Sequence, residues 1–196
     1  TRITFDRCRF INIVAAGSFH SLGGISTRYG VYKQFKITRC HFEGMGNMEA
    51  INLRGGTWTD LLIANNTFVT KGNFGAVDFY SSPTFSGANN YIVHNSMLQV
   101  SGTHRTFNGS FSGTLKVRNN AVVNLGTKTK CSATSVDAFS YNCVSNMNFI
   151  DPRDGTDVVG DPAFKSTSVP YDLHLKATSK CLKRGQKIPV AGDDID

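Results

Sequence analysis

The chain has 196 residues, of which 40% are hydrophobic and only 18% are charged, a composition that excludes a disordered tail or a long coiled coil. Its formal net charge of +7 is suited to an acidic polysaccharide, an anionic membrane surface or a nucleic acid. The basic residues are scattered along the sequence instead of forming a stripe, which makes nucleic acid the least suited of these partners. No apolar run reaches the roughly 18 residues of a membrane helix, so we expect no membrane span.

Five copies of one short pattern follow one another along the chain. Each copy has apolar residues at its first, third and last positions and a polar or small pair at its fifth and sixth positions. The copies are residues 3–10, 35–42, 61–68, 91–98 and 115–122. Their third residues lie 32, 26, 30 and 24 positions apart. Alternation with a period of two within each copy predicts one short strand per copy.

A second series of strands is expected between these copies. It is centred on Ile25, Ile51, Val77 and Phe107, which follow one another after 26, 26 and 30 residues. The two series share one period, so each repeat contains at least two short strands separated by Gly, Asn and Ser. Helical spacing is poor throughout, and the many Gly and β-branched residues argue against long helices.

A small repeat without helices cannot bury a core by itself and must stack on its neighbours. We therefore predict an all-β fold, a single-stranded right-handed parallel β-helix (a solenoid) of about six or seven coils. Residues 1–150 would form the coils, and residues 151–196 an irregular C-terminal cap of the same domain. The N-terminal coil shows no such cap, so we expect other chains or an upstream segment to cover its strand edges.

Asn residues recur at one place in successive copies and predict a sharp bend there. They are Asn65, Asn66, Asn95, Asn119, Asn120 and Asn142. Stacked at about 4.8 Å, each amide would bond to the next coil, and Asn tolerates the left-handed backbone of a bend. Cys8 and Cys40 take this place in two earlier copies, as a disulfide or as a ladder of thiols. Cys131 and Cys143 can close a small disulfide loop, which would imply an oxidising compartment, or stay buried thiols.

The bend at residues 63–68, Ile-Ala-Asn-Asn-Thr-Phe, resembles the strand-and-bend unit of the pectate-lyase-like superfamily of right-handed parallel β-helices. Four later stretches are similar to the closing segment of many extracellular β-helix proteins, although Lys180 stands where Pro is usual. These stretches are 140–143, 160–164, 171–175 and 177–181. The resemblance implies the fold and a location outside the cell, on its surface or on a virion. It does not select one activity, because such proteins include lyases, hydrolases, adhesins and inert scaffolds.

Alternation in the second strand series places one set of polar side chains on the outside of the coils. We predict that they form a polar, partly basic strip suited to sugar carboxylates and ring faces. The candidate ligand-binding residues are Arg28, Asn52, Arg54, Asp78, Tyr80, Arg105 and Asn108. Only Asp78 among them is acidic, so we predict no metal site and no cofactor. Calcium would suit a lyase of this fold, but no cluster of ligands supports it.

Two function classes are consistent with this strip. The favoured one is a non-catalytic extracellular or virion-type scaffold that contacts glycans. The alternative is a polysaccharide lyase acting on an acidic, uronate-containing polysaccharide, with Arg54 or Arg28 as the base. A glycoside hydrolase would need paired carboxylates on the strand face, and the sequence predicts none there.

Overall fold

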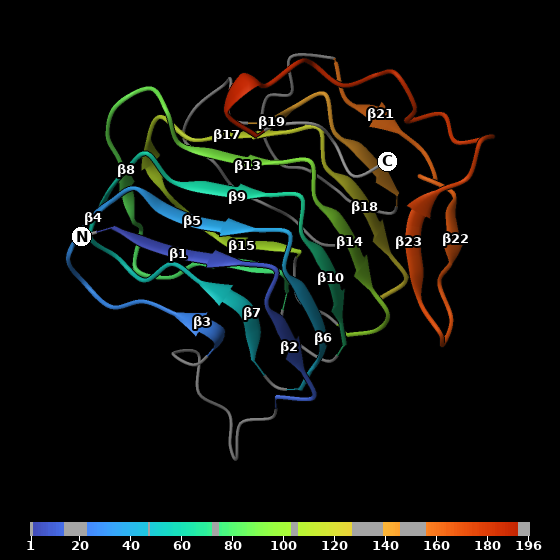
Figure 1. Cartoon of the computed structure of the whole chain (residues 1–196), viewed down its shortest axis with the longest axis horizontal. Coiled ribbons are helices and arrows are strands. Elements are labelled where there is room, and N and C mark those ends of the chain that lie inside the picture. The colour runs from blue at the N-terminus through green and yellow to red at the C-terminus, as the bar shows by residue number, and fades with distance from the viewer. Residues whose placement is uncertain are drawn as a thin grey trace.

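The computed structural model describes residues 2–13, 23–46, 48–71, 75–102, 106–126, 139–145 and 156–191. In these ranges the chain coils repeatedly around one axis, and its strands form four sheets that run along the stack (Figure 1). A separate hairpin and the short 3-10 helix Pro189–Ala191 follow near the C-terminus. No helix among the described residues is long and apolar enough to cross a membrane.

The four sheets are numbered here by the order in which their first strands occur. Sheet 1 contains β1 (Ile3–Asp6), β5 (Phe35–Thr38), β9 (Leu62–Ala64), β13 (Tyr91–Val93), β17 (Lys116–Arg118) and β19 (Phe139–Ser140). Sheet 2 contains β2 (Arg9–Ile11), β6 (His41–Met45), β10 (Thr67–Thr70), β14 (Ser96–Gln99), β18 (Ala121–Asn124), β20 (Cys143–Ser145) and β21 (Val158–Val159). Sheet 3 contains β3 (Gly23–Ser26), β7 (Glu49–Asn52), β11 (Val77–Phe79) and β15 (Phe107–Gly109). Sheet 4 contains β4 (Val31–Lys33), β8 (Thr57–Thr59), β12 (Thr84–Phe85) and β16 (Ser112–Gly113).

Strands in each of these sheets pair in parallel with the equivalent strand of the next coil, which confirms the predicted parallel solenoid. Val77 pairs with Ile51 on one side and with Phe107 on the other, and Ile25 pairs with Ile51. The second strand series is therefore in the register that the repeat spacing predicts. The exception lies in the C-terminal part, where β22 (Phe164–Ser166) and β23 (Asp172–Leu175) form an antiparallel hairpin.

The solenoid has about four complete turns, fewer than the six or seven coils predicted from the repeats. Sheets 3 and 4 have four strands each, and a full turn takes one strand from every sheet. The complete turns are β1–β4, β5–β8, β9–β12 and β13–β16, and the repeat count was too high because β17 and β18, and then β19 and β20, are followed by no described strands in sheets 3 and 4. These end segments are partial turns. Sheet 2 continues past residue 150, because β21 pairs in parallel with β20.

Like side chains stack on like inside the solenoid. The ring centroids of Phe10 and Phe42 are 4.7 Å apart, and those of Phe42 and Phe68 are 4.9 Å apart. Tyr32 stacks on the fully buried Trp58 at 4.2 Å. Each fully buried ring contributes about 2–3 kcal/mol of hydrophobic free energy, and the parallel register places these rings directly above one another.

The predicted Asn ladder is present at the bend between sheets 1 and 2. Its members are all buried: Asn66, Asn95, Asn120 and Asn142. The side-chain oxygen of each later Asn accepts two hydrogen bonds from the Asn one coil earlier, one from its backbone N–H and one from its side-chain amide. The ladder ends at Asp157, whose carboxylate accepts the same two bonds from Asn142. The neighbouring Asn65 and Asn119 have φ angles of 57° and 55° and supply the left-handed bend.

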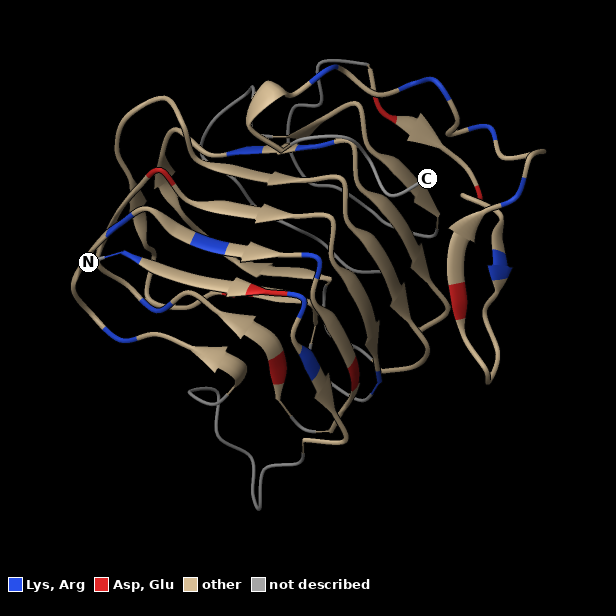
Figure 2. Ribbon diagram, in the orientation of Figure 1, with Lys and Arg blue, Asp and Glu red and all other residues tan. Residues whose placement is uncertain are grey.

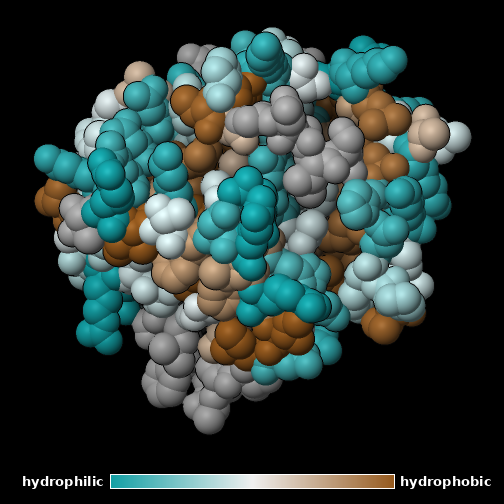
Figure 3. Space-filling view, in the orientation of Figure 1, coloured by the Kyte–Doolittle hydropathy of each residue, from teal (hydrophilic) through white to brown (hydrophobic). Residues whose placement is uncertain are grey.

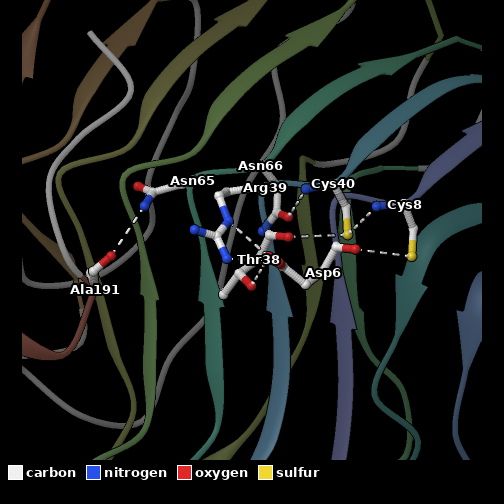
Figure 4. Close-up of polar contacts among 8 residues, drawn as sticks. All are labelled: Asp6, Cys8, Thr38, Arg39, Cys40, Asn65, Asn66 and Ala191. Carbon is white, nitrogen blue, oxygen red and sulfur yellow. Dashed lines mark hydrogen bonds and ion pairs between the residues drawn. The ribbon is translucent and has the colours of Figure 1, made fainter.

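Cys40 and Cys8 continue this bend into the first coils as free thiols (Figure 4). The backbone N–H of Cys40 donates to the side-chain oxygen of Asn66 at 2.8 Å, and that of Cys8 donates to the Cys40 sulfur at 3.4 Å. Burial raises the pKa of the Cys40 thiol. A sulfur therefore takes the place that an amide oxygen takes in the later coils.

The structure pairs Cys143 with Cys181, which corrects the predicted bridge between Cys131 and Cys143. A cysteine can form only one disulfide, and the C-terminal segment returns to β20 so that the two Cα atoms lie 5.6 Å apart. Short spacing in the sequence favoured Cys131, which lies outside the described residues. The return of the C-terminal segment has no periodic signal that sequence reasoning could detect.

Candidate functional site

The predicted strip lies on the outer side of sheet 3 and on the bend that follows it. The register places Asn52 beside Asp78 and Asp78 beside Asn108 on successive coils, as predicted. The Asn108 amide donates to the Asp78 carboxylate at 2.8 Å. Arg28 follows β3 and is exposed, whereas Arg105 lies outside the described residues.

Two members of the predicted strip are buried. Asn52 and Asp78 have 0% and 1% of their surfaces exposed, so neither can meet a ligand directly in this conformation. Alternation along a strand shows that a side chain points away from the core, but it does not show what packs above it. The predicted register is confirmed for these two residues, and the predicted exposure of their side chains is wrong.

The structure adds Glu49, which the sequence reasoning missed, to this row. Glu49 begins β7 and is only 1% exposed. It lies two residues before Ile51, so simple alternation assigns it to the core. Both Ala50 and Ile51 are packed in the core, which reverses the alternation and brings Glu49 to the side of Asn52 and Asp78. The sequence signal for a buried acid was a charged residue between two apolar ones, Met48 and Ala50, which are both buried.

Burial, and after it the negative charge of Asp78, raises the pKa of Glu49 to about 8. A hydrogen bond with Asn52 opposes this shift, and no described residue forms a hydrogen bond with the Glu49 Oε2 atom. At neutral pH, Glu49 is therefore mostly protonated. Its burial separates this acid from any substrate on the surface.

The part of the site that reaches the surface is made of the exposed Tyr29 and Tyr80 and the half-buried Arg54, which we call the Tyr–Arg–Tyr cluster. The Arg54 guanidinium carbon lies 4.8 Å from the centroid of the Tyr80 ring and 5.9 Å from that of the Tyr29 ring. Tyr29 is 64% exposed and Tyr80 is 36% exposed. Contact between Arg54 and Tyr80 was expected from the register, whereas Tyr29 lies in a bend outside the alternating strands and was missed.

Backbone contacts hold this cluster at the end of sheet 3. The N–H of Arg54 donates to the Thr27 hydroxyl at 3.1 Å, and the N–H of Gly55 donates to the Tyr80 carbonyl at 2.8 Å. Gly55 has a φ of 55°, and a Cβ atom there would overlap the Tyr29 ring. Hydrogen bonds from Ser81 and then from Arg54 lower the pKa of the Tyr29 hydroxyl.

Comparisons with protein-family models, curated proteins and solved structures found no match. The chemistry of this site therefore has to be argued from its own residues. Across the described ranges, no three His, Cys, Asp or Glu side chains gather closely enough to hold a metal ion. The cluster offers a fixed positive charge between two aromatic rings, an arrangement that can pair with an anion and stack on a flat apolar face.

Proposed function

We propose that this protein is a non-catalytic extracellular or virion-type β-helix scaffold that contacts acidic glycans through the Tyr–Arg–Tyr cluster. The observation that carries the proposal is the guanidinium of the half-buried Arg54, which lies against two exposed tyrosine rings. A uronate presents a carboxylate for the guanidinium and C–H groups for a ring face. Because Arg54 is already positioned by its neighbours, binding would order few side chains.

Other features support the location and the family in this proposal. The Cys143–Cys181 disulfide is typical of oxidising compartments outside the cytosol.

The Asn bend and the closing segment favour a right-handed member of the pectate-lyase-like superfamily, and parallel crossovers are nearly always right-handed. Among the described strands, β1 to β4 each pair with only one neighbour, and we propose that another chain or a further coil covers these edges.

A polysaccharide lyase is the second candidate, favoured by the partly exposed Arg54, which could act as a base on a uronate. Such a reaction also needs a group that neutralises the substrate carboxylate. The acidic groups that could hold a cation there, Glu49 and Asp78, are buried. Incubation with pectate or alginate, followed by the absorbance of unsaturated products, separates the two functions. Product formation that Arg54→Ala abolishes would replace the scaffold proposal with the lyase.

Replacement of Arg54 by Ala is expected to weaken binding of a uronate oligosaccharide about five- to tenfold, because the charge-assisted contact is lost. The melting temperature should change by less than about 2 °C, since Arg54 lies outside the core. Isothermal titration calorimetry with oligogalacturonate and oligoguluronate measures the effect.

The matched control is Lys165→Ala, which removes one exposed positive charge from the distant hairpin strand β22. It should leave the affinity within about twofold of the wild-type value, because a distant exposed charge is largely screened by salt. Equal losses in both variants would mean that net charge attracts the glycan and that the cluster is ordinary surface.

A further inference from the structure

We propose a second, separate binding site for a short acidic oligosaccharide in a groove on the outer face of sheet 1. This groove encloses about 470 Å³. Its lining residues come from β1, β5, β9, β13, the adjoining bends and the C-terminal segment. They are Arg2, Thr4, Gln34, Lys36, Asp60, Leu62, Asn89, Tyr91 and Val190. None belongs to the Tyr–Arg–Tyr cluster, which lies at the end of a different sheet.

The floor of the groove is one row of side chains across successive coils. In register, Lys36 is beside Leu62, Leu62 beside Tyr91, and Tyr91 beside Lys116. The residue after each of the first three, such as Ile37, is fully buried in the core, so the row itself points outward. At about 4.8 Å per strand, Lys36 and Lys116 begin roughly 14 Å apart, with an apolar residue and a ring between them.

One wall of the groove is the C-terminal segment, which is held against sheet 1. Ile188 belongs to one buried apolar cluster with Leu62 and Val93. The Asn65 amide donates to the carbonyl of Ala191 at 3.1 Å, and the N–H of Gln186 donates to the Asn119 side chain at 2.9 Å. These contacts place Val190 at the edge of the groove, so the wall is built by tertiary contacts and does not depend on a ligand.

The charges around the groove favour an anion. Arg2 and Lys36 line it, Lys116 is the next residue in register after the lining residue Tyr91, and Asp60 is the only acidic side chain among the described lining residues. Lys116 is positioned by the Tyr91 hydroxyl, 3.2 Å from its Nζ atom, and lies 4.9 Å from the ring centroid. Figure 2 shows basic residues on this face, and Figure 3 shows that hydrophilic and apolar side chains are mixed over it.

The backbone of the groove floor favours a saccharide over a peptide or a nucleic acid. β5, β9 and β13 each pair with a strand on both sides, so they have no free edge for main-chain bonds to an added peptide strand. Three cations are few for a nucleic acid, whose affinity depends on many phosphate contacts. A short chain of sugars bearing carboxylate or sulfate groups matches widely spaced cations with an apolar floor between them.

Lysine footprinting tests this site directly. The folded protein is acetylated under limiting reagent with and without a uronate tetrasaccharide or a sulfated tetrasaccharide, and each lysine is quantified by mass spectrometry. We expect acetylation of Lys36 to slow at least about threefold with one of these ligands. Lys165 and Lys71, both exposed and outside the groove, are the controls. Equal slowing at all three lysines, or none at Lys36, would overturn the proposal.

Variants separate this site from the Tyr–Arg–Tyr cluster. Lys36→Glu should abolish the binding that remains in Arg54→Ala, with a melting temperature close to that of the wild type because Lys36 is exposed. Protection of Lys36 that persists in Arg54→Ala would support the groove even if the cluster bound nothing. If an acidic peptide protected Lys36 and both saccharides failed, the ligand class proposed here would be wrong.

Discussion

Replacing Asn95 by Asp is expected to destabilise the solenoid by about 3–5 kcal/mol at neutral pH, a large share of the 5–15 kcal/mol typical of a domain. The Asn95 amide donates to the carbonyl of Ile63 at 3.0 Å and to the side-chain oxygen of Asn120 at 2.9 Å. Asp would lose both donors and place a buried negative charge against two oxygens. Urea denaturation followed by circular dichroism measures the loss.

Asn89→Asp is the matched control for this ladder variant, because the same change is made at an exposed Asn. Its free energy of unfolding should stay within about 0.5 kcal/mol of the wild-type value. Stability of Asn95→Asp should partly return in acid, where the carboxyl is protonated and can donate to Asn120. If Asn95→Asp were as stable as Asn89→Asp, the ladder would not contribute to stability.

Glu49→Gln is expected to stabilise the protein at alkaline pH and to flatten its dependence on pH. The pKa of Glu49 is about 8 in the folded protein against 4.5 for an ordinary Glu. Below pH 4.5 the group is protonated in both states. As the pH rises from 4.5 to 8, the unfolded chain releases this proton first, so the folded state loses stability. Gln keeps the neutral shape, and we expect a gain of about 2–4 kcal/mol at pH 9.

Urea denaturation at intervals between pH 4 and pH 9 tests this expectation. Wild type and Glu49→Gln should have similar free energies of unfolding near pH 4 and should diverge progressively between about pH 5 and pH 8. Glu43→Gln is the control, since Glu43 lies on β6 with its carboxylate 3.0 Å from His41 and a partly exposed side chain. Parallel curves for wild type and Glu49→Gln over the whole range would show that Glu49 is not the buried acid.

The stacked parts of this fold were predictable because stacking repeats a requirement at a fixed spacing. The Asn ladder is the clearest case: each of the later coils has an amide at the same bend, so Asn95 and Asn120 recur in the sequence. The pairing of Val77 with Ile51 follows from the same spacing. Such features could be predicted without coordinates.

Features that break the repeat could not be predicted. Glu49 changes faces because Ala50 and Ile51 both enter the core, and Tyr29 reaches Arg54 from a bend that has no alternation. Cys181 meets Cys143 only because the C-terminal segment folds back along the stack. The register alone predicted half of the candidate site, and long-range packing determined the other half.

The fold-back of the C-terminal segment also affects how the molecule comes apart. In a simple stack each coil touches only its neighbours, so coils can fray one at a time from either end. Here the Ala191 carbonyl accepts a hydrogen bond from Asn65, 126 residues earlier in the chain, and Cys181 forms a disulfide with Cys143. These two contacts connect the C-terminal segment to the outside of the later coils, so these coils cannot unfold one at a time. Loss of the end coils should therefore be cooperative, and fraying should begin at the opposite end, at β1 and β2.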